Sequence, residues 1–370
     1  MTLTDAPRPV EPGGTEATHP EDPDVPTDSP REREDPSRPM APPSPRGPLS
    51  AALIRLMRHT RLAGLDLVEA SATGALARAT DLLDDDDIQL ALFLLYELHY
   101  GGIEGVPDAW EWEPRLLKVR LDLERAFELA LRRAVPQPTA TRGVPEALFE
   151  LVSRDDTPGL SAWVERDATA EQVREVLVCR SIYTLKEADP HSWAIPRLHG
   201  PAKVALVEIQ ADEYGGGRPE RQHAELFAAA LRGAGLDDRY GAYADHVPAR
   251  VFTSMNLMSF FGLHRRWRGA IVGHLAAYEM TSTQPCRAYA RGLRRLGFPD
   301  DVVEYFDEHV EADAVHEQLA ARDLAGGLAE TEPALIDDIL FGASACLTID
   351  GRLWSGVRAA FERGESARAR

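Results

Sequence analysis

The sequence predicts an all-α fold: a helical bundle preceded by a helical extension and a disordered N-terminal tail. Apolar residues recur at helical spacing from Leu49 onward. No segment shows a convincing alternation of β-branched and polar residues, and helix-start signals precede several of the periodic segments. With 370 residues, of which 44% are hydrophobic, the chain is long enough to bury a sizeable core.

The predicted tail comprises residues 1–48, which hold 13 of the 27 prolines and almost no aliphatic side chains. Such a segment cannot bury enough apolar surface to offset the entropy lost on ordering. The predicted extension, residues 49–140, contains three helical stretches that are broken at the acidic run 84–87 and at the glycine pair 101–102. A connector rich in proline and threonine, residues 136–144, separates the extension from the remainder.

The predicted bundle comprises residues 141–365. Thr169 followed by Gln172 makes a capping box, which predicts a helix that reaches Glu187. Pro219 suits the first position of another helix. Further helices are expected near residues 200–213, 264–281, 300–320 and 333–347.

The net charge and the cysteine content limit the expected binding partners and the expected cellular location. The formal net charge of -19 leaves no overall positive field for nucleic acid or anionic lipid, so neither is an expected partner. Cys179, Cys286 and Cys346 lie far apart and form no disulfide framework or zinc motif. The sequence shows no signal peptide pattern and no apolar run of membrane-spanning length, which together with the cysteine content favours the cytoplasm.

One helix carries a candidate metal-binding stripe. His309, Asp313 and His316 stand at i, i+4 and i+7, which brings all three side chains to within roughly 40° of one stripe of a helix. Two imidazoles and a carboxylate, without a thiolate, suit iron or manganese better than zinc. The alternative is a solvated acidic face with incidental histidines.

A second cluster favours the metal interpretation. Glu220 and His223 form an E-x-x-H pair, and Asp313 and His316 form a D-x-x-H pair. Two such pairs, joined by single carboxylates from two other helices, hold two irons in four-helix bundles.

Glu187 and Glu279 can supply the single carboxylates. Glu279 lies in a helix of small and apolar residues, where a buried carboxylate without a positive partner would be costly. Three consecutive glycines and a proline between Glu213 and His223 argue against an unbroken helix there. Glu213 and Glu220 therefore compete for one coordination place.

Other polar residues receive a structural interpretation. Glu208 and Asp212 are interpreted as part of an exposed carboxylate face. Glu97 and His99 are two residues apart, a spacing that points their side chains to different sides of a helix. Tyr183, one turn before Glu187, either packs in the core or lines a cavity. His274 shares a helix with Glu279 but faces away from it.

The ordered ligand set resembles that of the haem-oxygenase-like di-iron oxidases and oxygenases, also called the iron-containing redox enzyme family. The resemblance covers roughly residues 145–350, and its most specific parts are the segments DEYGGGRPERQH and HVEADAVH. It implies a haem-oxygenase-like bundle and favours Glu213 over Glu220. The implied iron ligands are Glu187, Glu213, His223, Glu279, His309, Asp313 and His316.

The resemblance also implies two Fe ions as cofactor, O₂ as co-substrate, a small-molecule substrate, an external electron donor and a homodimer that the N-terminal arm helps to form. The implied reaction is oxygenation of an amine nitrogen, which the third histidine favours, or oxidative C–C cleavage of a small carboxylic acid. A non-catalytic iron-binding protein and a ferritin-like oxidase that uses Glu220 are the rival hypotheses. Fe/Fe and Mn/Fe centres both remain open.

Overall fold

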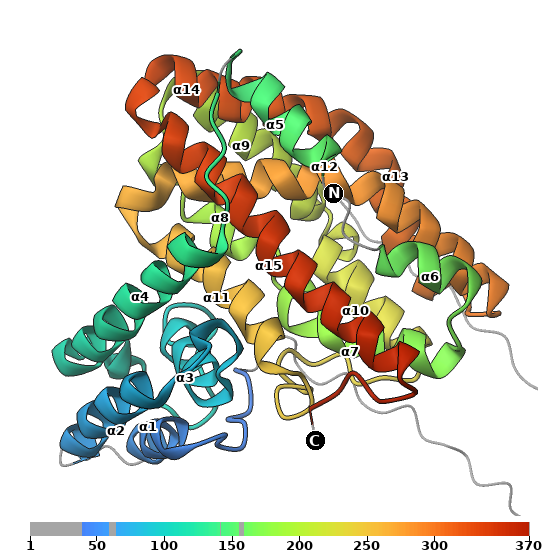
Figure 1. Ribbon diagram of the computed structural model, residues 1–370. Helices are drawn as coiled ribbons and strands as arrows, with labels where there is room; N and C mark the ends of the chain where they lie inside the picture. The colour runs from blue at the N-terminus through green and yellow to red at the C-terminus, as the bar shows by residue number, and fades with distance from the viewer. Residues whose placement is uncertain (1–38, 59–63, 141, 155–158, 370) are drawn as a thin grey trace, which may run out of the picture. The chain divides into compact units, whose positions relative to one another are not determined.

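The computed structural model describes residues 39–58, 64–140, 142–154 and 159–369, apart from the side chains of residues 311–315. Within these ranges the regular structure is helical, and one isolated bridge joins Met40 to Ile103. The all-α prediction is therefore confirmed. The α-helices are α1 (Pro48–Arg58), α2 (Leu65–Arg78), α3 (Asp86–Glu97), α4 (Pro114–Ala134), α5 (Val144–Ser153), α6 (Leu160–Arg166), α7 (Ala170–Thr184), α8 (Asp189–Ser192), α9 (Gly200–Glu213), α10 (His223–Gly233), α11 (Ala249–Leu263), α12 (Arg268–Arg295), α13 (Asp300–Gln318), α14 (Gly327–Thr331) and α15 (Ile336–Glu362) (Figure 1).

Local capping signals determine where several helices begin. At the start of α7, the Gln172 amide donates to Thr169 Oγ1 at 3.3 Å, and the Thr169 amide donates to Gln172 Oε1 at 3.0 Å. The predicted capping box is therefore confirmed. At the start of α3, Asp85 accepts a hydrogen bond from the Ile88 amide at 2.9 Å. The acidic run therefore both interrupts the helical spacing of apolar residues and caps α3. Such a cap contributes about 1 kcal/mol to the stability of the folded protein.

Two helix boundaries differ from the prediction. The helix expected to reach Glu187 ends at Thr184, so Glu187 lies in the turn that follows α7. The helix expected to begin at Pro219 begins at His223, because Gln222 is extended (φ -57°, ψ 134°) and Pro219–Arg221 form a separate 3₁₀ turn. The fixed φ of proline suits a 3₁₀ turn as well as an α-helix.

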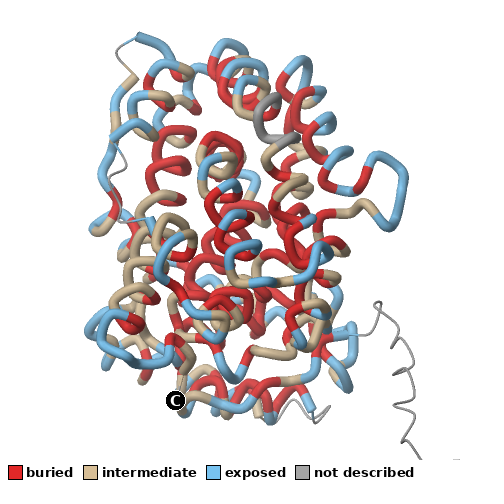
Figure 2. The backbone as a smooth tube through the Cα atoms, turned by 90° about the vertical axis from the view of Figure 1, so that its right-hand side faces the viewer, coloured by how far each residue is buried: buried red, intermediate tan, exposed pale blue. Residues whose placement is uncertain are grey.

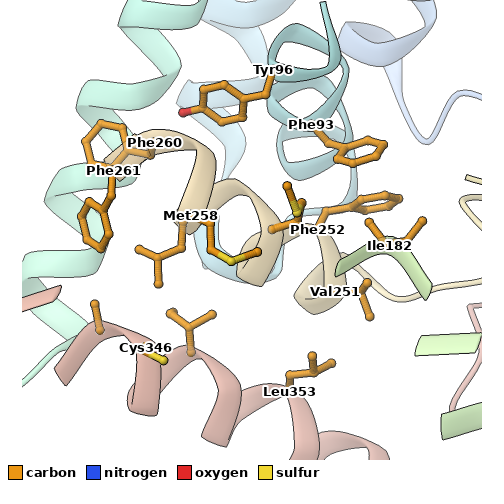
Figure 3. Packing of buried hydrophobic residues seen from close by; sticks show 14 of the residues in the cluster. Phe93, Tyr96, Ile182, Val251, Phe252, Met258, Phe260, Phe261, Cys346 and Leu353 are labelled. Carbon is orange, nitrogen blue, oxygen red and sulfur yellow. The ribbon is translucent and has the colours of Figure 1, made fainter. Parts of the chain in front are cut away.

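The core of the bundle is built around α11 and the pair α12 and α15. Along α11 nearly every side chain is buried, and Phe252, Met258 and Phe260 are fully enclosed (Figure 3). Where α12 crosses α15, a Cβ added to Gly273 would lie 1.8 Å from the Ile339 carbonyl oxygen. Only glycine permits this close approach of two backbones. Buried segments gather in the interior of the bundle and exposed ones on its outside (Figure 2).

The helices α1 to α4 are joined to the bundle by polar contacts. The Arg250 guanidinium of α11 pairs with the Asp84 carboxylate at 2.7 Å. The hydroxyl groups of Tyr100 and Ser259 lie 3.1 Å apart. None of the helices among the described residues combines the length and apolar character that crossing a bilayer requires.

The predicted tail is described only in part. Residues 1–38 lie outside the described residues. Residues 39–48 differ from a disordered tail, because Met40 is only 2% exposed and the Ser44 amide donates to Asp245 Oδ1 at 2.7 Å. Arg46 donates to the Ala244 carbonyl at 2.8 Å, so hydrogen bonds hold this proline-rich segment where its few apolar side chains could not.

Candidate metal centre

Two groups of buried or nearly buried side chains could each hold a metal ion. Within each group, the ligand atoms all lie within 4.8 Å of one another. Six of the seven predicted ligands are members, and the side chain of Asp313 lies outside the described residues. The first group is Glu187, His223 and His309, and the second is Glu213, Glu279 and His316.

The first group brings together the turn after α7 and the helices α10 and α13. His223 Nδ1 lies 3.8 Å from Glu187 Oε1, and His309 Nε2 lies 3.7 Å from the same oxygen. The rings of His223 and His309 stand with centroids 4.4 Å apart. These separations are too long for hydrogen bonds and suit donors that surround a common cation.

The second group brings together α9, α12 and α13. Glu213 is the last residue of α9, and Glu279 lies in the middle of the long helix α12. His316 Nδ1 stands 3.4 Å from Glu279 Oε2. The second group therefore offers two carboxylates and one imidazole, whereas the first offers one carboxylate and two imidazoles.

Glu213 links the two groups. Its Oε2 lies 3.1 Å from Nδ1 of His223, a member of the first group, although Glu213 itself belongs to the second. His309 and His316, two helical turns apart on α13, contribute one imidazole to each group. The arrangement can therefore hold two cations side by side, with the Glu213 carboxylate between them.

Buried polar atoms that lack a hydrogen-bond partner show whether the two groups suit a metal ion. Among the described residues, Glu213 Oε2, His223 Nδ1 and His316 Nδ1 are buried without a hydrogen-bond partner. A buried polar atom left without a partner costs about 1–3 kcal/mol. Glu213 Oε2 and His223 Nδ1 lie 3.1 Å apart, and His316 Nδ1 lies 3.4 Å from Glu279 Oε2. Cations held by the two groups would therefore satisfy all three atoms. Neither group includes a cysteine, and such donor sets suit iron or manganese.

Hydrogen bonds to neighbouring residues orient the two histidines of α13. His309 Nδ1 donates to the Tyr305 carbonyl at 2.7 Å, which leaves Nε2 facing Glu187. His316 Nε2 donates to Asp212 Oδ2 at 2.9 Å, which leaves Nδ1 facing Glu279. Metal-binding histidines commonly donate their second N–H in this way. Asp212, which the sequence indicated as an exposed carboxylate, thus has a positioning role that residue spacing did not reveal.

Comparison with known proteins agrees with this geometry. Residues 174–351 match the model of a family described as iron-containing redox enzymes. Over these residues, the chain is similar to the iron-containing redox enzymes. All six grouped side chains lie inside the matched range. The match indicates an iron-dependent oxidoreductase, in agreement with the resemblance predicted from the sequence. Among curated proteins, none matches this chain.

The ionisable side chains of the two ligand groups influence one another's pKa values. Burial by itself lowers the pKa of His316, yet the carboxylates of Glu279 and Asp212 outweigh it and raise that pKa to about 9. Burial raises the pKa of Glu279. For His223, the charge of Glu213 outweighs burial and raises the pKa. Without a metal ion, protons on the imidazoles thus balance the negative charge of the carboxylates.

The other residues considered from the sequence fall outside the two groups. Glu220 is exposed on a 3₁₀ turn, so the geometry favours Glu213 in the disputed coordination place. His274 is buried beside His191, with their ring nitrogens 3.2 Å apart. His99 Nδ1 lies 3.1 Å from Glu111 Oε1, which fits a structural role.

A cavity of about 220 Å³ extends from the first ligand group of the redox enzyme into the bundle. Glu187 and His309 form part of its wall. Tyr183 also lines it and stacks on Tyr278 with ring centroids 5.3 Å apart, so both interpretations offered for Tyr183 hold in part. Tyr305, whose hydroxyl donates to Glu187 Oε2 at 3.2 Å, lies between the cavity and the ligands.

Proposed function

We propose that this protein is a non-haem di-iron oxidoreductase that uses O₂ to oxygenate the nitrogen of a small amine or amino acid. The observation that carries the proposal is the pair of ligand groups that share Glu213 beside an internal cavity. One iron would be held by Glu187, His223 and His309. The other would be held by Glu213, Glu279 and His316.

The iron pair, when bound, supplies the activation of dioxygen, which side chains cannot perform. The net reaction for a primary amine inserts one oxygen atom into an N–H bond and gives a hydroxylamine. The second oxygen atom leaves as water, with two electrons and two protons from an external donor. The nitrogen must present its lone pair, so the amine reacts in its neutral form.

The chain's own residues supply orientation and exclusion of water. The Tyr305 carbonyl and Asp212 fix the two α13 histidines, as their hydrogen bonds indicate. Burial raises the pKa of the Tyr305 phenol well above its usual value, so the phenol stays protonated and keeps donating to Glu187. The enclosing helices restrict the site to molecules small enough to enter the cavity.

Two rivals share the ligand set. Oxidative C–C cleavage of a carboxylic acid would release a shortened product instead of an oxygenated nitrogen. A non-catalytic iron-binding protein would need no cavity at its ligands, and the cavity walled by Glu187 and His309 therefore favours an enzyme.

Iron loading under anaerobic conditions, followed by exposure to oxygen, tests the proposal. We expect about two irons per chain, in line with the two ligand groups, and a Mössbauer spectrum of coupled ferric ions after oxidation. With a reductant and a panel of amines and amino acids, O₂ uptake should continue over many turnovers. One product should carry an atom of ¹⁸O on nitrogen.

Two outcomes would overturn the proposal. The first is a single iron per chain. The second is O₂ uptake that stops once the stored ferrous iron is oxidised, whatever substrate is added; this outcome favours the iron-binding hypothesis. A product shortened by carbon dioxide, without oxygen on nitrogen, would replace N-oxygenation by C–C cleavage.

A further inference from the structure

The cavity contains two oppositely charged side chains besides the metal-binding group. Arg180 projects from α7 and Asp350 from α15, and both line the cavity wall. Each is half-buried, and among the described residues the two are not in ion-pair contact, although the positive charge of Arg180 favours the ionised form of Asp350. Apolar side chains, including Val251, Cys346 and Leu353, form part of the remaining wall (Figure 3).

Arg180 is held rigidly but lacks a carboxylate partner. Its guanidinium carbon lies 5.1 Å from the ring centre of Tyr289 and 5.3 Å from that of Trp354. Its Nε is buried without a hydrogen-bond partner in the part of the chain that the structure describes. A guanidinium fixed between aromatic rings presents planar donors that match a carboxylate. The side chain is therefore poised for an anionic ligand.

Asp350 supplies the complementary charge. Its Oδ1 accepts a hydrogen bond from the Ser254 hydroxyl at 2.8 Å. Burial raises the pKa of Asp350, because the surrounding helices disfavour its charged form. A cationic group in the cavity would offset that cost.

We propose that Arg180 and Asp350 determine substrate specificity by binding the carboxylate and the ammonium group of an amino acid in its zwitterionic form. The rest of the ligand then occupies the part of the cavity walled by Glu187 and His309. This inference rests on the proposed function only in taking the bound amino acid as the substrate. The reacting nitrogen is accordingly one that the ligand carries beyond its α-amino group.

Charge balance distinguishes a zwitterion from simpler ligands. A carboxylic acid would pair with Arg180 but bring no cationic group to Asp350, and an amine would pair with Asp350 but bring no carboxylate to Arg180. Leaving one charge of a buried pair uncompensated is strongly unfavourable. The cavity of about 220 Å³ exceeds the roughly 150 Å³ that holds a benzene molecule. It is smaller than the 300–1,000 Å³ typical of drug-sized ligands, as expected for an amino acid.

Calorimetric titration of the iron-loaded full chain under strictly anaerobic conditions tests the inference, because no turnover occurs without O₂. The probes form matched trios: norleucine with pentylamine and hexanoate, phenylalanine with phenethylamine and 3-phenylpropanoate, and lysine with 1,5-diaminopentane and 6-aminohexanoate. In at least one trio, we expect the amino acid to bind at least about tenfold more tightly than either partner compound, since each partner leaves one charge unpaired.

Variants of Arg180 and Asp350 test which side chain binds the carboxylate and which binds the ammonium group. Arg180→Gln should remove the preference for the amino acid over the amine, and Asp350→Asn should remove the preference over the acid. Arg180→Lys keeps the charge but loses the fork of donors, so it should retain part of the preference. Arg291→Gln is the matched control, because Arg291 is exposed and pairs with Glu165. It should bind like the unmodified chain.

The inference is overturned if no amino acid of the three trios binds, or if in every trio the amine or the acid binds as tightly as its amino acid. Unchanged binding by Arg180→Gln and Asp350→Asn, both with native helical content, would also overturn it. A protein that binds amino acids through these residues but does not consume O₂ would support the inference and refute the proposed function.

Discussion

At the scale of single residues, the centre depends on a few donor atoms that have no other partner. Glu213 Oε2 and His223 Nδ1 stand 3.1 Å apart, buried, without a hydrogen bond among the described residues. Folding tolerates such atoms when a cation or a proton compensates them. Glu213 is the residue whose carboxylate reaches both groups, so its loss should affect both.

The first prediction concerns the disputed carboxylate. Glu213→Gln removes the charge between the groups, and the iron content should fall from about two per chain to about one or less, because a neutral amide oxygen is a weaker ligand. Glu220→Gln is the matched control, since Glu220 is exposed seven residues later in the chain. Iron would be counted by elemental analysis. Loss of iron in Glu220→Gln alone would show that the geometric assignment is wrong.

A second prediction follows from the raised pKa of His316, which is about 9 in the metal-free centre. Below that pH the imidazole carries a proton that a metal must displace. Metal affinity should therefore fall as the pH falls, by about tenfold per pH unit for one displaced proton. Competition titrations with Mn²⁺ between pH 6.5 and 8.5 would measure this slope. A flat profile over that range would contradict the proton linkage.

At the scale of elements, the turn between α9 and α10 brings two ligands together. Glu213 ends α9 and His223 begins α10. Gly215, Gly216 and Gly217 all adopt positive φ angles of 79°, 58° and 83°. A straight helix would point residues ten positions apart in different directions. The three left-handed residues reverse the chain and let the second helix return to the first.

The third prediction compares two glycines of this turn. A Cβ at Gly215 would lie 2.7 Å from the Gln222 amide nitrogen, whereas a Cβ at Gly217 would meet nothing within 4 Å. Both alanine variants carry the cost of a positive φ, about 1–2 kcal/mol. Gly215→Ala should lose about 1–3 kcal/mol more, because the backbone next to His223 must move. It should also lose iron, while Gly217→Ala keeps it.

Denaturant unfolding and iron counting on the two glycine variants would measure these effects. Equal stability and equal iron content in both would mean that the close backbone approach at Gly215 does not position the ligands.

At the scale of the whole described unit, buried polar contacts join the N-terminal helices to the metal-binding bundle. Glu97 of α3 pairs with the ammonium group of Lys186, the residue directly before Glu187. The Tyr240 hydroxyl also donates to Glu97 Oε1, at 2.9 Å. Lys186 and Glu97 are both buried. The segment that carries the candidate metal ligand Glu187 is thus anchored to a helix of the extension.

The fourth prediction is that Glu97→Ala destabilises the protein by about 3–5 kcal/mol, because it leaves the Lys186 ammonium buried without its partner. The double variant Glu97→Leu with Lys186→Met removes both charges and should recover much of that stability. Guanidinium unfolding followed by circular dichroism would measure both. A loss below about 1 kcal/mol in the single variant, a value typical of exposed pairs, would show that this contact does not anchor the bundle.

Structural features that depend on residues close together in the chain could be predicted from the sequence. Helical spacing of apolar residues and the Thr169 capping box predicted helices, because the interactions that produce them span only a few residues. The spacing of His309 and His316 predicted that both imidazoles share one face of α13. The apolar surroundings of Glu279 indicated that its carboxylate has a positive partner. These features predicted the fold class, and together with the family resemblance they predicted the six side chains that the structure groups.

The tertiary structure alone decided which distant residues meet. It placed His309 and His316 in different groups, placed Glu213 in one of these groups and Glu220 on the surface, and gave Asp212 a hydrogen bond to a residue 104 positions away. It also brought Arg180 and Asp350 into one cavity. Contacts between residues so far apart depend on how whole helices pack, and packing is determined by the shapes of all the buried side chains together, which no short stretch of sequence specifies.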